Sequence, residues 1–528
     1  MSPRMSPALR ARLLALGAAA LLLRLGVLAL VLLDPGVGLQ VDEAQYWDWS
    51  RELHWGYYSK PPGIAALIAA STAIGGDGVL GVRWLAMAVQ VAACLALGPL
   101  AHDLAQAAWP QEPARARRAA LWATLIALSN PVAGLLGLAA TTDAPLLLCW
   151  TLAAHALWRL RRSGRLRDGL ALGLGLGLGL LSKYTMAALL PGLLWWLWRR
   201  RHDGGPDARP ALALALALAA LLLVPNLLWN AAAGWPTLHH TAEITLQARR
   251  DAQRPVLASL AEWIGGQWLM SGPLWLVLWL RWRRRSAQRE PLPAPVRELL
   301  LAMTLPLLAL GAAQALNAKA QINWTAPATQ GLVLALALWL APAARRPLRR
   351  AAAGIVALHL LLVSTLPLIG TATRLAGGDG AVPPRALDLW ARMRGWEPAL
   401  AALAPAARGP LADGALLLGA DRTLIAHGRH AWRDLPGADW RAWRPDPSRP
   451  PTDHYQLVAG WPGAQGIAAA DRGRTVLIVA EGDTPPQGWE AFAPPEPLAR
   501  ASAPQSGSPL RLTLWRTRIP APVPESPR

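Results

Sequence analysis

The chain has 528 residues, 53% of them hydrophobic, and a formal net charge of +20. Several long apolar runs, such as residues 211–228, carry no charged side chain. This composition predicts a protein that spans the lipid bilayer and excludes a purely soluble one. The arginines form short clusters between apolar runs instead of one basic face, which indicates membrane topology and excludes a nucleic-acid partner.

The first apolar run, residues 13–33, follows Arg4, Arg10 and Arg12. It is too long for the core of a signal peptide, so we interpret it as a retained first span. Further spans are predicted at 82–104, 119–137, 144–160, 169–182, 185–198, 211–230, 264–280, 298–316, 326–343 and 352–370. The arginine clusters then all fall on one side of the membrane, which the positive-inside rule assigns to the cytoplasm.

Two of these spans, 169–182 and 185–198, are short and lie next to each other in the sequence. Counting them as one long helix would invert every later span and place two arginine clusters outside, so we prefer a tight hairpin between them. The first of the two contains glycines four residues apart, at Gly173/Gly177 and Gly175/Gly179. Such pairs predict faces on which a neighbouring helix approaches closely.

The spans divide the chain into two parts. Residues 1–370 are interpreted as a transmembrane domain with a first periplasmic loop at 34–81, and residues 371–528 as a C-terminal domain outside the cytoplasm. The predicted fold class is therefore an all-α polytopic membrane bundle of about 11 helices with a C-terminal soluble α/β domain on the extracytoplasmic side.

The C-terminal part differs in composition from the spans, being rich in Pro, Gly, Arg and Trp. Short apolar runs at 415–418 and 475–480 predict strands, and residues near 386–404 predict a helix. Asp421, Arg422, His427 and Tyr455 are the polar residues of this part that draw notice. We interpret them as ordinary surface or packing residues.

The first outer loop concentrates carboxylates and aromatic rings. Residues 42–63 include four carboxylates, three tyrosines and three tryptophans. Aromatic belts at the membrane interface explain the tyrosines and tryptophans. They do not explain Asp42 and Glu43, because a carboxylate near the end of a span is costly unless it is paired, hydrated or functional. Capping of a helix that starts near Asp42 is the structural alternative to catalysis or ligand binding.

Three of the 52 basic residues are lysines: Lys60, Lys183 and Lys319. All three lie at the outer face in the predicted topology. Where arginine is favoured everywhere else, lysines on one face suggest positions at which a compact ammonium group matters. Chance placement is the alternative, and we favour a shared functional site.

The motifs of the outer face also occur in a recognisable order. The residues Asp42-Glu43-Ala44 and Tyr46-Trp47, followed by Trp55-Gly56-Tyr57-Tyr58 and Lys60-Pro61-Pro62, resemble the first periplasmic loop of family 39 membrane glycosyltransferases. This family is related to protein O-mannosyltransferases and to the enzymes that add aminoarabinose to lipid A. The match continues through 142–145, 181–185, Trp229-Asn230, Gly234-Trp235, 265–267, Asn323-Trp324 and 326–328. It covers roughly residues 10–370 in family order.

The resemblance implies a glycosyltransferase C fold in the cytoplasmic (inner) membrane, with the active site at the extracytoplasmic face. It implies that a sugar moves, with inversion, from a polyprenyl-phosphate-linked donor to an acceptor, for which lipid A, a polysaccharide, a protein and a wall polymer are candidates. By position, Asp42 resembles the catalytic carboxylate and Lys60 the lysine that meets the lipid phosphate. The other candidate site residues are Glu43, Tyr57, Tyr58, Asp143, Lys183, Tyr184, Asn230, Gln267, Lys319 and Asn323.

The chemistry of these residue types agrees with such a transfer. A base must take the proton of the acceptor hydroxyl as it attacks the anomeric carbon, and Asp42 fits that role. The departing lipid phosphate is a good leaving group, so cationic stabilisation by lysines matters more than a general acid. Asp143 opens a span, where it either caps the helix or orients the sugar. Glu43 is expected to support the geometry around Asp42.

No metal ligands are predicted. His239, His240 and Glu243 have ligand-like spacing, but a metal site needs further ligands that the sequence does not place beside them. A divalent cation is the one cofactor that the resemblance leaves open, because some relatives contain one and others work without it.

Two other function classes compete with the transferase. A transporter or flippase of a lipid-linked sugar would also have many spans, but transporters place ionisable residues near the bilayer midplane and often contain inverted repeats. Here the carboxylates gather at one face, and the two halves show no repeat. A non-catalytic membrane scaffold would leave the acidic, aromatic first loop unexplained.

Overall fold

The computed structural model describes residues 5–247, 255–283, 291–317, 321–342, 346–378, 380–444, 448, 450–458, 460–462, 471–485, 489 and 492–520. The chain folds as two compact units. The first unit contains Met1–Gly26, His54–Gly56 and Lys60–Thr365. The second contains Val27–Leu53, Tyr57–Ser59 and Leu366–Arg528.

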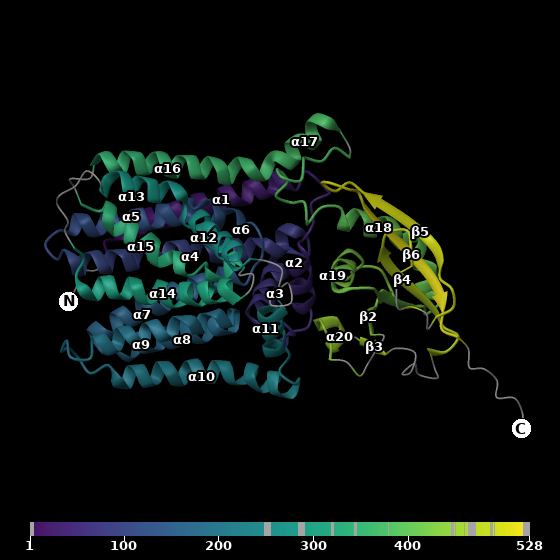
Figure 1. The fold of residues 1–528 in the computed structure, drawn as a ribbon, viewed down its shortest axis with the longest axis horizontal. Coiled ribbons are helices and arrows are strands. Elements are labelled where there is room, and N and C mark those ends of the chain that lie inside the picture. Colours follow the sequence, from purple (N-terminus) through teal and green to yellow (C-terminus); the bar gives the residue numbers. More distant parts are fainter. Residues whose placement is uncertain are drawn as a thin grey trace, which may run out of the picture. The chain divides into compact units, whose positions relative to one another are not determined.

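The first unit is a bundle of helices, and helix α1 passes from it into the second unit (Figure 1). The α-helices are α1 Pro7–Val31, α3 Gly63–Gly75, α4 Val79–Ala108, α5 Pro113–Ser129, α6 Pro131–Leu136, α7 Asp143–Ser163, α8 Leu166–Ser182, α9 Leu189–Arg199, α10 Arg209–Ala232, α11 Pro236–Gln247, α12 Val256–Ser271, α13 Pro273–Arg283, α14 Ala294–Asn317, α15 Ala328–Leu340 and α16 Arg346–Thr365. Two short 3-10 helices, η1 Tyr184–Ala188 and η2 Ile322–Thr325, complete it. Helices suit a lipid-embedded chain because they satisfy their backbone hydrogen bonds internally.

The structure confirms that the predicted membrane part of the chain is a bundle of helices. A helix lies in each of the ranges expected to span the bilayer. By length and hydropathy, five helical segments among the described residues suffice to cross a membrane: α1, α4, α10, α14 and the segment Arg346–Gly377. The chain is therefore a multi-pass membrane protein.

The glycine-rich helix α8 packs closely on two neighbours, as its spacing predicts. A Cβ on Gly173 would lie 2.7 Å from the carbonyl oxygen of Ala215 in α10. One on Gly175 would lie 3.1 Å from the backbone nitrogen of Ala153 in α7. The absence of a side chain on the two glycine faces is what lets both helices approach the α8 backbone.

Helix α8 ends at Ser182, and the chain then folds back instead of continuing. Lys183 has an extended backbone (φ −162°, ψ 130°), and η1 starts at the next residue. Met186 packs against Gly179, at 2.8 Å from the position of a Cβ there. The predicted hairpin is therefore confirmed, and one long helix through this region is excluded.

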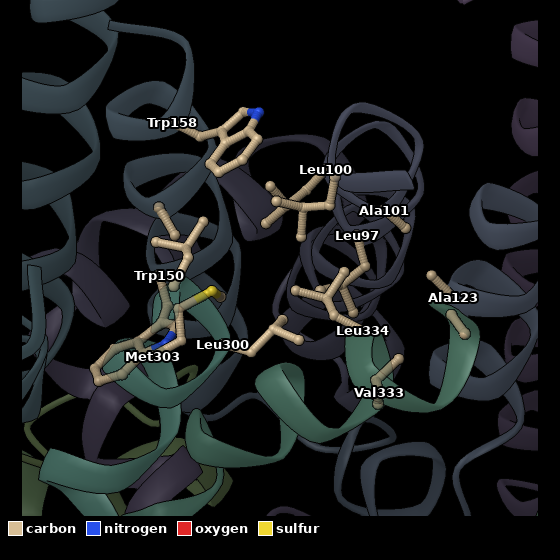
Figure 2. Close-up of a cluster of buried hydrophobic side chains, with 14 of the residues drawn as sticks. Leu97, Leu100, Ala101, Ala123, Trp150, Trp158, Leu300, Met303, Val333 and Leu334 are labelled. Carbon is tan, nitrogen blue, oxygen red and sulfur yellow. The ribbon is translucent and has the colours of Figure 1, made fainter. Parts of the chain in front are cut away.

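Apolar side chains from five helices interlock at the centre of the first unit (Figure 2). Leu100 of α4, Ala123 of α5, Trp150 of α7, Leu300 of α14 and Leu334 of α15 are all buried there. Large rings pack against small residues, which fills the space between helices at the density of a protein interior. This core fixes the helix ends that carry the candidate polar residues of the first unit.

The second unit joins residues 27–53 to the C-terminal part of the chain. Its helices are α2 Val41–Trp49, η4 Leu366–Leu368, α17 Ile369–Gly377, α18 Trp396–Ala412, α19 Arg422–Ala431 and α20 His454–Val458. Its strands are β1 Leu416–Gly419, β2 Trp440–Arg444, β3 Gly460–Pro462, β4 Thr475–Glu481, β5 Glu496–Ala503 and β6 Leu510–Arg518. They form one sheet in the order β3-β2-β1-β4-β6-β5 (Figure 1). Strands β1 to β4 are parallel, whereas β6 is antiparallel to β4 and to β5.

The predicted strands at 415–418 and 475–480 are confirmed as β1 and β4. The helix expected near 386–404 starts later than predicted, because α18 begins at Trp396 after turns that occupy the preceding residues. Gly395 has a left-handed backbone (φ 91°), which stops a helix from extending back through it. The α/β character of this part is therefore correct, while its first helix is shifted.

A buried ion cluster anchors the segment between α1 and α2. Asp34 pairs with Arg394 and, at 2.9 Å, with Arg374, while Arg394 also pairs with Asp388 at 3.0 Å. The backbone nitrogen of Gly38 donates to the carbonyl oxygen of Met393 at 3.0 Å. Each buried charge has an opposite charge beside it, which offsets the cost of removing it from water. The start of α2 is thereby tied to the C-terminal part of the same unit.

Candidate active site

Helix α2 begins with a capping box that does not use the Asp42 carboxylate. The Gln40 side chain accepts from the Asp42 backbone nitrogen at 2.6 Å, and the Glu43 carboxylate accepts from the Gln40 backbone nitrogen at 2.9 Å. These two side chains satisfy free N–H groups at the helix start. Glu43 is buried, so its capping role agrees with the expectation that it supports geometry. The Asp42 carboxylate makes no hydrogen bond of the capping box, and 47% of the Asp42 side chain is exposed.

Arg422, at the start of α19, is the residue that faces Asp42 within the second unit. Its Nη1 lies 3.0 Å from Asp42 Oδ1 and donates to Gln45 Oε1 at 2.9 Å. Asp421 precedes it as the N-cap of α19 and accepts from the Thr423 backbone nitrogen at 2.6 Å. Arg422 was interpreted from the sequence as an ordinary surface or packing residue, and that interpretation missed its contact with the candidate base.

A second arginine extends this contact along α2. Arg429 pairs with Asp48 at 3.2 Å, so the starts of α2 and α19 lie together and so do their ends. Burial raises the pKa of Asp48, and the Arg429 charge partly offsets that increase. The Trp47 ring meets the His430 ring edge-on, with centroids 4.8 Å apart. The orientation of α2, and with it the position of Asp42, is set by α19.

Tyr57 and Tyr58, both predicted to bind substrate, have structural contacts. Tyr57 is fully buried, stacks on Trp49 with ring centroids 4.4 Å apart, and donates from its hydroxyl to the Trp49 carbonyl oxygen at 3.0 Å. Tyr58 is also buried and donates to the Pro451 carbonyl oxygen at 3.1 Å. These contacts hold the loop in shape, and a direct contact of either ring with substrate stays a prediction.

In the first unit, the segment His54–Gly56 packs on the C-terminal end of α10. A Cβ on Gly56 would lie 2.3 Å from the Trp229 ring. The Asn226 side chain donates to the Trp55 carbonyl oxygen at 2.6 Å. The glycine in the Trp-Gly-Tyr-Tyr motif is therefore required by the close approach of an indole ring, which leaves no space for a side chain.

Gly56→Ala is expected to lower the stability of the protein by about 1–3 kcal/mol, because the added methyl group would overlap the Trp229 ring. The measurement is thermal unfolding of the purified protein in detergent. Gly354→Ala in α16 is the matched control, since a Cβ there meets nothing within 4 Å. Equal unfolding temperatures for the two variants would contradict the close packing described.

The chain after Lys60 also reaches the hairpin that carries Lys183. A Cβ on Gly63 would lie 2.7 Å from the Leu181 carbonyl oxygen, so the start of α3 abuts the end of α8. Lys60 precedes this contact by three residues, and Lys183 follows it by two. Both lysines are partly buried. The structure thus places two of the three lysines on segments that touch, while Lys319 lies outside the described residues.

Lys183, in the hairpin between α8 and α9, is part of a polar cluster of the first unit. Lys183 Nζ lies 2.7 Å from Asp143 Oδ1, and both side chains are largely buried, with 12% and 14% exposed. Asn323 donates from Nδ2 to Asp143 Oδ2 at 3.3 Å. Gln267 supports this arrangement by donating to the Ile322 carbonyl oxygen at 3.1 Å. Asp143, Lys183 and Asn323, all candidates from the sequence, therefore come together.

Asp143 was expected either to cap its helix or to orient a substrate. It is the first residue of α7, and its two carboxylate oxygens contact Lys183 and Asn323. The residue that precedes the helix, Thr142, makes no side-chain capping hydrogen bond. The structure therefore shows Asp143 as the centre of a polar cluster that joins α7, the hairpin and η2.

A second polar group fixes the hairpin on its other side. The Tyr184 hydroxyl donates to Asn226 Oδ1 at 2.5 Å, and Asn230 Nδ2 donates to the same hydroxyl oxygen at 3.2 Å. Tyr184 and Asn230 were sequence candidates, whereas Asn226 was missed. Asn226 stands four residues before Asn230 on α10, so the helical repeat of two asparagines was the signal that could have found it.

Two cavities lie beside these residues. One of about 500 Å³ is lined by Gln267 together with Trp268, Trp275, Leu308, Leu332 and Trp339. The other, of about 50 Å³, is lined by Asp143, Gln90, Asn130 and Thr141 among others. The large cavity is mostly apolar, as expected of a site for an apolar chain, whereas the small one has polar groups that suit water or one polar substituent.

The described residues contain no group of three or more His, Cys, Asp or Glu side chains that could hold a metal ion. His239 and Glu243 do lie one turn apart in α11, which agrees with their predicted spacing.

The fold and the polar clusters define a multi-pass helical membrane protein with a small C-terminal sheet. Crystal structures of ArnT from Cupriavidus metallidurans, in the apo state and bound to undecaprenyl phosphate, match it with TM-scores of 0.57 and 0.58. Each match covers 96% of this chain and 98% of ArnT, at 15% and 16% sequence identity. The predicted glycosyltransferase C architecture is confirmed by this likeness of fold.

Sequence comparisons confirm the family resemblance. Residues 59–229 match the family described as dolichyl-phosphate-mannose-protein mannosyltransferase. The chain is also similar to the lipid A galacturonosyltransferase RgtD of Rhizobium johnstonii, with 30% identity over 311 residues. That alignment covers 57% of this chain and 60% of RgtD, so the chain spans less than two thirds of this relative's length. Lys60, Asp143 and Lys183 lie inside the family match, and Asp42 precedes it.

Proposed function

We propose that the protein is a membrane glycosyltransferase that moves a sugar from a polyprenyl-phosphate-linked donor to an extracytoplasmic acceptor, with inversion at the anomeric carbon. The observation that carries the proposal is the state of Asp42. Gln40 and Glu43 cap the helix, so the half-exposed Asp42 carboxylate stays outside the cap, with Arg422 beside its Oδ1, and is the candidate base. A positioned carboxylate beside an acceptor hydroxyl supplies the general base that the reaction needs.

The donor class is supported by the large cavity and by the related proteins. A mostly apolar cavity of about 500 Å³ suits part of a polyprenyl chain. ArnT has been crystallised with undecaprenyl phosphate, and RgtD is a lipid A galacturonosyltransferase. These relatives favour a lipid acceptor such as lipid A over a protein or a polysaccharide. Lys60 and Lys183 are the proposed cations for the lipid phosphate, and Tyr184, Asn230, Gln267 and Asn323 hold the surrounding segments in place.

We also propose how the chain is oriented in the membrane. Eleven spans that start inside place residues 371–528 and the first loop, 34–81, outside the cytoplasm. The arginine clusters support this orientation in the cytoplasmic (inner) membrane, because basic residues are retained on the cytoplasmic side. The active site then faces the periplasm, where lipid-linked donors meet their acceptors. A divalent cation stays a proposal that metal addition to the purified protein would test.

The proposal is tested by reconstituting the full chain in vesicles with a polyprenyl-phosphate-linked sugar and purified lipid A. Transfer is measured by mass analysis of lipid A and by the polyprenyl phosphate released. A transporter would instead move the donor between leaflets without forming a new glycosidic bond. Unmodified acceptors, together with unchanged envelope glycoconjugates in cells that lack the protein, would overturn the transferase function.

Arg422→Gln is expected to lower kcat by about 10- to 100-fold, because Asp42 would lose the contact that orients it towards the acceptor hydroxyl. KM for the lipid-linked donor should change little, and Arg422→Lys should restore part of kcat by keeping the charge. Steady-state kinetics in vesicles measure both constants. Arg441→Gln is the control, since Arg441 contacts Asp439 in the same unit. A rise in KM with kcat unchanged would contradict a positioning role for Arg422.

A further inference from the structure

A second polar cavity of the first unit lies far from the cluster of Asp143, Lys183 and Asn323. It has a volume of about 410 Å³ and lies where α7, α9 and the start of α14 meet. Its lining includes three arginines and one carboxylate, namely Arg161, Arg162, Arg200 and Asp203. Asp143 starts α7, whereas Arg161 stands in its last turn. About 27 Å of helix separates the two positions, so the cavity is no part of the polar cluster around Asp143.

Arg161 is held in place by the loop after α9. Its Nη2 donates to the carbonyl oxygens of Arg200, at 2.8 Å, and Gly204, at 2.9 Å. A Cβ on Gly205, which lines the cavity, would lie 3.0 Å from Arg161 Nη1. One guanidinium nitrogen therefore anchors the side chain, while glycine keeps space open in front of another. A guanidinium fixed in this way loses little freedom when it binds an anion.

The charged residues that line the cavity sum to a positive charge. Arg200 pairs with Asp203, at 3.0 Å, and with Glu298. Arg199 also pairs with Glu298, at 3.3 Å. Three arginines and one aspartate in the lining give a net charge of +2, and adding Arg199 and Glu298 leaves that sum unchanged. Arg200 Nε is buried without a hydrogen-bond partner among the described residues.

Aromatic and proline side chains form the other walls. Trp158 and Trp196 are buried, with ring centroids 5.9 Å apart. Trp196 donates from Nε1 to the Pro295 carbonyl oxygen at 2.9 Å. Walls of low polarity strengthen the attraction between a bound anion and the arginines. Tryptophans are also enriched at the membrane interface, where lipid headgroups lie.

We propose that this cavity binds a phosphate group, and that an anionic phospholipid headgroup supplies it. Basic pockets between the cytoplasmic ends of membrane helices bind such headgroups. Helices α7 and α9 both end in arginines, so the positive-inside rule places this end at the cytoplasmic leaflet. Arg161 and Arg162 bind the phosphate oxygens, and Arg200 contributes positive potential from the cavity wall. The proposal does not rest on the transferase function.

The test is lipid retention by the full chain in detergent, measured by native mass spectrometry. Phosphatidylglycerol should be retained in preference to phosphatidylcholine. Arg162→Gln and Arg161→Gln should each weaken phosphatidylglycerol binding by about fivefold. Arg201→Gln is the matched control, because Arg201 belongs to the same cluster but donates to the Trp198 carbonyl oxygen, away from the lining. Arg162→Gln keeps the test valid if Arg161→Gln fails to fold.

The bound phosphate group could come from a phospholipid headgroup or from free inorganic phosphate. Competition with inorganic phosphate distinguishes these two sources. Release of bound phosphatidylglycerol by phosphate, at concentrations that leave the control unfolding temperature unchanged, supports the shared phosphate chemistry. Phosphate binding without phosphatidylglycerol retention would overturn the lipid source. Equal retention of both lipids, or unchanged retention in both cavity variants, would overturn the site itself.

Discussion

Replacing Asp42 by Asn is expected to reduce sugar transfer by at least about 100-fold, because the variant lacks the base for the acceptor hydroxyl. Asparagine keeps the size of the side chain and can still face Arg422, so the fold should be preserved. The helix start should also survive, since its capping box uses Gln40 and Glu43. The measurement is the initial rate of transfer in vesicles that contain the lipid-linked donor and the acceptor.

The matched control for this experiment is Asp439→Asn. Asp439 is an exposed carboxylate of the same unit that pairs with an arginine, Arg441, at 3.1 Å. Its loss should leave the transfer rate unchanged. Undiminished transfer by Asp42→Asn would remove the catalytic role of Asp42. A lower transfer rate together with a lower unfolding temperature would assign Asp42 a structural role instead.

Breaking the Asp143–Lys183 pair is expected to have the second large effect. Lys183→Met leaves the Asp143 carboxylate buried beside an apolar side chain, which should destabilise the protein by about 3–5 kcal/mol. Asp143→Asn should cost less, because the amide oxygen still accepts a hydrogen bond from Lys183 and so partly offsets the unpaired ammonium. Thermal unfolding in detergent measures both variants.

The double variant Asp143→Asn/Lys183→Met separates the effect of the ion pair on stability from its effect on transfer activity. Without a buried unpaired charge, it should regain most of the unfolding temperature. Transfer activity should stay low, because the proposed cation for the lipid phosphate is absent. Recovery of both stability and activity would show that the pair serves the fold alone, and Lys60 would then be the remaining proposed cation among the described residues.

Much of the fold could be predicted from local sequence. Apolar runs located the helices, and glycines four residues apart located the close contacts of α8 with α7 and α10. Both signals are local, since hydropathy acts on one helix at a time and a missing side chain shows in the sequence itself. Helix α18 was misplaced, because the turn at Gly395 depends on a backbone conformation that composition does not specify.

The candidate site was predicted in part. The order of motifs selected Asp42, Lys60, Asp143, Lys183 and Asn323, and the structure brings the last three together. Tyr57 was selected as a substrate contact; the structure shows it buried and stacked on Trp49, and its contact with substrate stays a prediction. Aromatic residues in a loop have the same sequence pattern whether they face a ligand or stack on one another. Burial separates these cases, and it depends on the whole fold.

By itself, the sequence determined that the chain is a membrane bundle of helices, and it predicted that the candidate carboxylates and lysines lie at one face. Only the tertiary structure decided which side chains meet. It placed Arg422 against Asp42 and Gln45, the latter contact spanning 377 positions, and added Asn226 to the hairpin. The physical reason is that helix formation and membrane insertion depend on neighbouring residues, whereas ion pairs and buried hydrogen bonds depend on packing between distant segments.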